Sequence, residues 1–274
     1  FLYGLLALFL VLSLQACESN DPSLNASRLR LKLTDASSVV IKELYVDIRG
    51  VAVLLVDTAT HEGEWTTLEF PGRTYDVLKL MNGKTVQLVD QYVPAGTELH
   101  QIKLVLGDDN RMKTNTDSII PLIVPEELKD GIVMDAMKME MRLNTISSMV
   151  IDLNAALSIR NMGGKDNYLY PVARAFPETF GGKLKGYVGP PAANPYVKII
   201  QDKDTFLTYP EREKAADQQS MFQFVGLKEG EWEVHFIAHP ESNFKDTVVV
   251  ATVKSGETVS ASANPILLKL STEK

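Results

Sequence analysis

Short runs in which apolar and polar residues alternate follow one another along almost the whole chain, and this pattern constrains the fold most. Leu29, Leu31 and Leu33 alternate with arginine and lysine. Side chains of a strand point to its two faces in turn, so one face of this run is apolar and the other is charged. A strand of this kind buries one face and leaves the other in water, which predicts a layered β structure.

Comparable runs cover the first two thirds of the chain. They are residues 44–56, 64–70, 84–89, 98–106, 119–124, 138–143, 149–153 and 168–175. Turn-forming residues such as Asn82-Gly83 and Pro94-Ala95-Gly96 separate the runs. Only residues 77–81 and 125–131 are expected to form a short helical turn. Many short strands at this spacing predict an all-β sandwich.

A domain boundary is expected at residues 177–182, where Pro177 closes one set of strands and Gly181-Gly182 provides a hinge. Seven further strand runs follow this boundary, at residues 183–188, 196–201, 205–209, 221–224, 232–238, 247–253 and 260–270. We therefore expect two β-sandwich domains in series. The larger covers residues 28–177 and the smaller, with seven strands, covers residues 181–274.

The first sixteen residues are uncharged and mostly apolar, and they end in Leu14-Gln15-Ala16-Cys17. A comfortable transmembrane helix needs about 20 apolar residues, so the run is short for one. Its layout resembles the lipobox of bacterial lipoproteins, in which the signal peptide is removed and the new N-terminal Cys is acylated. We expect residues 1–17 to be this signal with its lipidated Cys17, and residues 18–27 to be a polar tether. The alternatives are an N-terminal membrane helix or cleavage without lipidation.

Cys17 is the only cysteine, and the chain carries a formal net charge of −7. The mature chain therefore has no disulfide, although an envelope compartment would permit one. An acidic balance with no lysine or arginine block disfavours nucleic acid as a partner, and it also disfavours electrostatic adsorption to a membrane. Membrane attachment is expected through acyl chains alone. Glu18, the residue after the Cys, is compatible with an outer-membrane lipoprotein that faces the periplasm or the exterior.

The first segment resembles a bacterial lipoprotein domain family without an assigned function. The family opens on Leu-Thr-Asp-Ala, which stands here at residues 33–36. Its further motifs match residues 46–53, 78–83, 94–96, 101–104, 150–155 and 170–175, in order. The resemblance implies kinship and a β fold of the immunoglobulin or transthyretin type, but it implies no activity.

The second segment resembles the transthyretin-like family that is also called carboxypeptidase regulatory-like. A Phe strand with Gly-Leu at residues 222–227 precedes Gly-Glu-Trp-Glu-Val at residues 230–234. Gly186-Tyr187-Val188 matches the first strand of the family, whereas Ser220-Met221 departs from its usual Gly. The resemblance implies a small sandwich that serves as a structural spacer.

Candidate catalytic groups are few. No Ser or Cys nucleophile stands at a recognisable spacing from His and Asp, and lipid would consume the thiol of Cys17. His61, His100, His235 and His239 show no metal-ligand spacing. His235 and His239 would meet on a helix, but they flank a strand run. We therefore expect no enzymatic activity, no cofactor and no metal.

Two patterns leave a metal site open as an alternative. Met137, Met139 and Met141 alternate with charged residues, and thioethers on one strand face bind Cu(I). Three adaptable apolar side chains also suit a sandwich core, which is the interpretation we favour. Acidic turns at residues 108–110 and 202–204 offer oxygen ligands for Ca²⁺ without an ordered spacing, so we expect solvated turns.

Asp35 and Asp152 belong to the motifs of the first family. A buried Asp that caps a turn explains both without a ligand, and we assign neither a catalytic role.

Aromatic side chains are candidates for a sugar-stacking surface. Trp232 alternates with Val234 and Phe236 and is therefore expected in the core, and Trp65 is expected to be a packed strand residue. Tyrosines at residues 168–170 and 187–196 flank the domain boundary and are candidates to line a groove between the domains.

The sequence thus predicts an envelope lipoprotein, anchored through Cys17, that acts as a non-enzymatic binding, adhesion or assembly module. Its expected partner is an envelope protein, recognised through a strand edge or a loop. The alternative is a glycan- or nutrient-binding accessory lipoprotein of an outer-membrane uptake complex. That alternative requires an exposed aromatic cluster.

Overall fold

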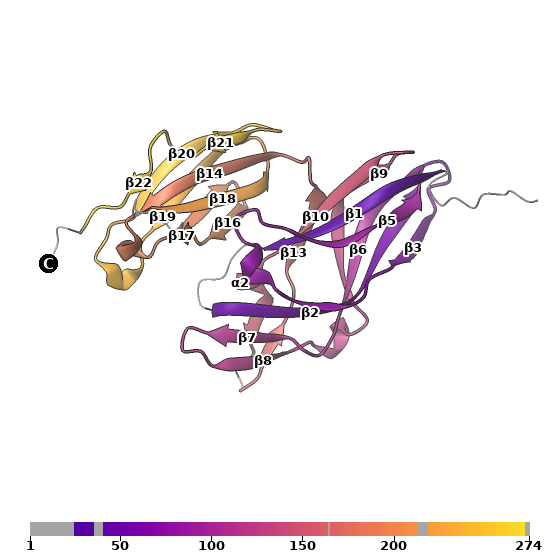
Figure 1. Ribbon diagram of the computed structural model, residues 1–274, viewed down its shortest axis with the longest axis horizontal. Coiled ribbons are helices and arrows are strands. Elements are labelled where there is room, and N and C mark those ends of the chain that lie inside the picture. The colour runs from indigo at the N-terminus through magenta and orange to yellow at the C-terminus, as the bar shows by residue number, and fades with distance from the viewer. Residues whose placement is uncertain (1–24, 36–40, 164, 213–218, 272–274) are drawn as a thin grey trace, which may run out of the picture.

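The computed structural model describes residues 25–35, 41–163, 165–212 and 219–271. They form an all-β protein of two sandwiches in series, as the alternation predicts (Figure 1). Cys17, the remainder of the expected signal peptide and most of the expected tether lie outside the described residues. Within the described ranges, no helix has both the length and the apolar character to cross a membrane.

The first sandwich consists of strands β1–β13 and short helical segments. The strands are β1 (Ala26–Asp35), β2 (Ile41–Asp57), β3 (Gly63–Leu68), β4 (Arg73–Asp76), β5 (Val86–Pro94), β6 (Thr97–Leu106), β7 (Arg111–Thr114), β8 (Ile119–Ile123), β9 (Ile132–Met141), β10 (Ile146–Leu153), β11 (Ile159–Asn161), β12 (Asn167–Leu169) and β13 (Ala173–Pro177). The helical segments are η2 (Val77–Leu80), η3 (Glu126–Leu128) and α2 (Ala155–Ser158). The first two lie where the sequence predicts helical turns.

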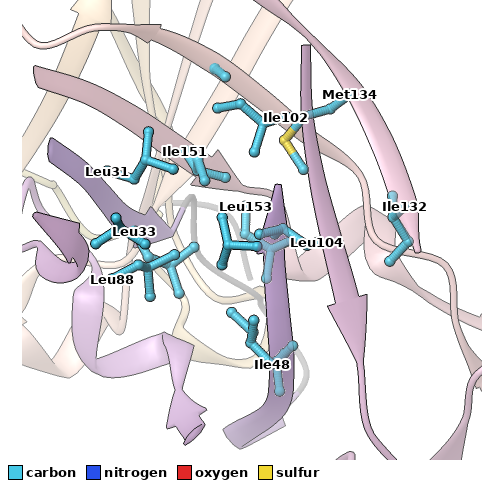
Figure 2. Close-up of a cluster of buried hydrophobic side chains, with 14 of the residues drawn as sticks. Leu31, Leu33, Ile48, Leu88, Ile102, Leu104, Ile132, Met134, Ile151 and Leu153 are labelled. Atoms are coloured by element: carbon cyan, nitrogen blue, oxygen red, sulfur yellow. The ribbon is translucent and has the colours of Figure 1, made fainter. Parts of the chain in front are cut away.

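All these strands form one sheet, in the order β11-β12-β8-β7-β2-β6-β9-β13-β10-β1-β5, with β3 and β4 paired to β2. The sheet curls so that its two halves face each other. Side chains from β1 and β10 pack in one apolar cluster with those from β2, β6 and β9 (Figure 2). Leu29, Leu31 and Leu33 of β1 are buried, as their alternation predicts. The parallel pairing of β1 with β10 sets Thr34 opposite Asp152, which brings two family motifs together.

The second sandwich consists of β14 (Gly182–Gly189), β15 (Tyr196–Gln201), β16 (Asp204–Thr208), β17 (Glu211–Arg212), β18 (Ser220–Leu227), β19 (Gly230–Ile237), β20 (Thr247–Val253), β21 (Thr258–Ser260) and β22 (Ile266–Leu267), with short turns η4 (Pro191–Ala193) and η5 (Pro240–Ser242). One sheet has the order β17-β18-β14-β21, with β22 also paired to β14, and the other has the order β16-β15-β19-β20. Trp232, Phe222 and Phe236 are fully buried between them. Trp232 is a core residue, as predicted.

Several boundaries differ from the sequence prediction. The first strand begins at Ala26 rather than at residue 28, because Ala26 and the next residue pair with the end of β5. The run 260–270 is not one strand, since Pro265 cannot donate to a ladder and β21 and β22 lie on either side of it. Strands β4, β7 and β11 are too short to show alternation, so the sequence does not predict them.

Candidate functional site at the junction of the two sandwiches

Arg174 is the central side chain where the two sandwiches meet. It lies on β13 directly opposite Asp152 of β10. Its Nε donates to Asp152 Oδ2 at 2.9 Å, and its Nη2 lies 2.7 Å from the same oxygen. The guanidinium also reaches the second sandwich, where Nη1 donates to the carbonyl of Gly226 at 2.8 Å and Nη2 donates to that of Val225 at 3.0 Å. One planar side chain therefore bonds to both sandwiches at once.

Two aromatic rings flank this guanidinium. Its carbon lies 4.7 Å from the ring centre of Phe176 and 4.1 Å from that of Phe206. Phe176 belongs to the first sandwich and Phe206 to the second. Gly226 has φ +62°, and a Cβ there would stand 2.3 Å from the ring of Phe176. Glycine at this position therefore lets the aromatic ring approach the chain that accepts the Arg174 bond.

Asn82 makes a second set of bonds across the junction. Its Nδ2 donates to the carbonyl of Tyr209 at 3.0 Å. Its Oδ1 accepts from the Thr208 hydroxyl and from the Gln223 backbone N–H, both at 3.1 Å. All three partners lie on the second sandwich. Asn82 is buried and left-handed, with φ 59°. Next to it, a Cβ on Gly83 would lie 2.4 Å from the side chain of Gln223. Glycine at this position therefore lets the Asn-Gly turn pack against the second sandwich.

Asp35, the last residue of β1, is the least satisfied group of the junction. Its Oδ1 accepts from the Ala155 backbone N–H at 3.1 Å, whereas its buried Oδ2 has no hydrogen-bond partner. Burial holds the pKa of Asp35 well above its usual value, and the nearby charge of Asp152 raises it further. Burial also raises the pKa of Asp152, and Arg174 opposes that rise. Both carboxyl groups and Arg174 line one cavity of about 20 Å³.

The expectation that buried aspartates cap a turn fits Asp35, which accepts the first backbone N–H of α2. Asp152 does not cap a turn. It pairs with Arg174, because the neighbouring strand sets that cation directly opposite.

Three larger cavities lie between the sandwiches, and Arg174 lines two of them. One of about 250 Å³ includes Leu157 and Lys203, a second of about 280 Å³ includes Phe180 and Trp232, and a third of about 280 Å³ includes Thr85 and Lys183. No tyrosine lines any of them, so the expected tyrosine-lined groove is wrong for these cavities.

The histidines do not come together. His100 lies 2.7 Å from Glu98, and His235 lies 2.9 Å from Glu233. His239 accepts from a backbone N–H two residues later, and His61 is exposed. Among the residues that the structure describes, no group of three or more His, Cys, Asp or Glu could hold a metal ion.

The methionines divide between two environments. Met141 is fully buried and Met139 packs against the core, as expected, but Met137 is 42% exposed. The pairing of β6 with β9 shifts register between Leu99 and Gln101, opposite this part of β9. A bulge of this kind reverses the faces of the strand, which removes Met137 from the face predicted by simple alternation.

The acidic turn at residues 108–110 is built into the fold. Asn110 is buried, and its side chain accepts from the Asp47 backbone N–H at 2.8 Å and donates to the Gly107 carbonyl at 2.6 Å. Asp109 pairs with Arg111. In the other turn Asp204 pairs with Lys228 at 2.7 Å. Internal partners thus account for both turns.

Trp65 is exposed, contrary to the prediction. It lies on β3 opposite Leu54 and faces outward, with 38% of its surface in solvent. The Lys103 amino group stands 4.7 Å from the ring centre. The lysine covers the ring in place of core side chains.

Sequence reasoning did not find the junction roles of Arg174 and Asn82. Arg174 stands in the last motif of the first family resemblance, and Asn82 stands in the Asn-Gly turn. Those two signals were visible, but neither shows that a residue faces another domain.

The fold is an all-β pair of sandwiches joined by a buried polar junction. A family described as a domain of unknown function (DUF4382) matches residues 26–170, which is more than half of the chain. The chain belongs to this family. No curated protein matches it.

Solved structures with a similar arrangement are distant. The shaft pilin SpaA of Lactobacillus rhamnosus GG is 8% identical, over 91% of this chain and 99% of that chain, with a TM-score of 0.25. BcpA, the major pilin subunit of Bacillus cereus, is 10% identical, over 90% and 71% of the two chains, with a TM-score of 0.22. The TIE protein of Bacillus anthracis is 10% identical, over 98% and 44%, with a TM-score of 0.24. These scores are too low to support an inference from those proteins to this chain.

Proposed function

We propose that this chain is a surface-anchored envelope lipoprotein that acts as a non-enzymatic binding, adhesion or assembly module. The observation that supports it best is the junction, where Arg174 and Asn82 together make five hydrogen bonds to the second sandwich. Such bonds hold two sandwiches in one orientation, which suits a module that presents a surface to a partner. The lipobox at Cys17 supports the anchor, and the two-sheet second sandwich supports its resemblance to the transthyretin-like family.

The anchor is tested by Cys17→Ala in the full chain. We expect the variant to leave the membrane fraction for the soluble fraction, because no acyl chain can be attached. Ser19→Ala, two residues away, is the matched control and should stay with the membrane. Retention of the Cys17→Ala protein would refute the lipid anchor.

The binding role is tested by cross-linking in intact envelopes, followed by purification of the chain. We expect one envelope protein, such as a transporter or a filament subunit, to be recovered with the wild type. Recovery should fall with Arg174→Met, in which the two sandwiches lose their fixed orientation. Recovery of lipid alone would contradict a protein partner.

A second candidate is a glycan- or nutrient-binding accessory lipoprotein of an outer-membrane uptake complex, and Trp65 supplies one exposed ring of the aromatic cluster that it requires. An exposed indole stacks on a sugar face, and Lys103 beside it offers a hydrogen-bond donor. Titration of envelope glycans into a Trp232→Phe variant would follow the fluorescence of Trp65 alone. Saturable quenching supports this candidate. A flat response, with the Trp65→Phe variant as blank, would exclude it for the glycans tried.

A further inference from the structure

Strand β20 forms an open edge of the second sandwich. It pairs with β19 on one side, and the described residues place no strand along its other side from Thr247 to Val253. Val248 is 53% exposed and Val250 is 59% exposed. The strand reads Thr-Val-Val-Val-Ala-Thr-Val, without a charge or a proline. An edge of this kind offers its free backbone N–H and C=O groups to another strand.

The other long edges are protected. On β5, Asp90 is bound by Arg28 and Arg30, and the strand ends in Pro94. Charged side chains and proline are the usual means of blocking an edge. On β16, the residues near the end contact the first sandwich, through the Arg174 guanidinium and through Asn82. β11 has three residues. β3 is also an edge strand, since it pairs only with β2, but it carries the charge of Glu64. β20 therefore differs from these edges in being long, uncharged and uncovered.

We propose that β20 is an interface for β20 of a second copy of this chain, paired antiparallel about a two-fold axis at Val250. The sequence is complementary to itself in that register. Val250 lies opposite its own copy, and Val248 lies opposite Thr252 of the other. At each end the exposed side chain of Asp246 faces the exposed Lys254. The Oδ1 of Asp246 accepts the Ala238 backbone N–H at 2.9 Å within its own sandwich, which holds this carboxylate in place. Pairs of β-branched residues on neighbouring strands stabilise such a ladder.

The chain itself limits the length of this interface. The Lys245 N–H donates to the Lys269 carbonyl at 2.9 Å, and Phe244 pairs with Leu270, so the edge just before β20 is already filled. Only residues 247–253 can accept a second strand. An interface of seven residues from each chain is small, so association depends on concentration. Attachment of many copies to one membrane would favour it by raising their effective concentration.

The lone cysteine makes a direct test possible. In the full chain with Cys17→Ala, Val250→Cys introduces one thiol, which the two-fold axis sets beside its own copy. Mild oxidation should convert this variant into a covalent dimer of twice the mass. Val133→Cys is the matched control, because Val133 is 47% exposed on the first sandwich and should remain monomeric. Equal cross-linking of the two variants would overturn the proposal.

A second variant separates pairing from chance collision. Val250→Lys places a charge on the open edge, and sedimentation of the Cys17→Ala chain over a range of concentrations should show loss of the dimer. Val133→Lys adds the same charge and should leave association unchanged. If the purified chain stays monomeric, the second copy is the wrong occupant. Cross-linking of Val250→Cys in intact envelopes to a different protein alone would lead to the same conclusion. None of these measurements uses the lipid anchor, so their failure would leave the proposed anchoring unaffected.

Discussion

The two sandwiches fill their interiors with different side chains. The buried residues of the first cluster are all Leu, Ile, Val, Met or Ala, contributed by a long curled sheet. The second cluster is centred on Phe222, Trp232 and Phe236, with the rings of Phe222 and Phe236 5.5 Å apart and close to perpendicular. A small sandwich has few inward positions, and each aromatic ring buries about 150–250 Å². The second sandwich therefore depends on a few large residues, whereas the first distributes the same task over many.

Among the substitutions that test this contrast, Phe236→Ala should lower the free energy of unfolding most. Removal of a fully buried ring costs about 3–5 kcal/mol of the free energy of unfolding, because the neighbours cannot fill the space. Urea unfolding of a Trp65→Phe background would follow Trp232 in the same sandwich. Leu31→Ala, monitored through Trp65 in a Trp232→Phe background, is the comparison in the first sandwich. If the two substitutions shifted both probes equally, the two cores would unfold as one unit.

Arg174→Met should cause the second-largest loss of stability, because it removes hydrogen bonds between the sandwiches. It leaves Asp152 buried without its cation and frees two carbonyls, which costs about 2–3 kcal/mol after allowance for the partial exposure of Arg174. The transitions of the two tryptophans should also separate along the urea axis. Asp152→Asn in the Arg174→Met protein should recover part of the loss. An absence of any recovery would mean that the buried charge is not the cause.

Asn82→Ala should have a smaller effect of the same kind. It removes three hydrogen bonds to the second sandwich, for about 1–2 kcal/mol. Lys84→Ala is the control at the rim, where the ion pair of Lys84 with Glu211 is exposed and contributes about 0–1 kcal/mol. Equal losses for Asn82→Ala and Lys84→Ala, in thermal unfolding, would contradict a special role for the Asn-Gly turn.

Asp35→Asn should give the smallest change, and its sign depends on pH. The raised pKa of Asp35 means that the folded state prefers the protonated form. The stability that this group contributes is present below its unfolded pKa, near 3.8, and is lost as pH rises through the raised folded value. Asp35→Asn should therefore be more stable than the wild type at pH 8 and show a weaker fall in melting temperature from acid to neutral pH.

The alternation of apolar and polar residues predicts much of this fold, as the leucines of β1 and the strand of Trp232 show. It fails where the geometry is not regular. Met137 lies within a bulge of β9, where the strand changes face, and Trp65 lies on an edge strand whose outer face is exposed. Alternation does not predict the residues of the junction. Arg174 and Asp152 meet because β10 and β13 pair in one register, and the contact of Arg174 with Gly226 depends on how the two sandwiches dock. Periodicity within one strand indicates neither the register of two strands nor the docking of two sandwiches.

The direction of β1 has a consequence for where partners can reach this protein. The strand starts at Ala26, next to the expected tether, and ends at Asp35 in the junction with the second sandwich. Ten residues of strand span about 33 Å at about 3.3 Å per residue. If Cys17 holds the chain to a lipid surface, the first sandwich separates that surface from the second by about this height. The open edge of β20 would then stand clear of the lipid headgroups, within reach of neighbouring molecules.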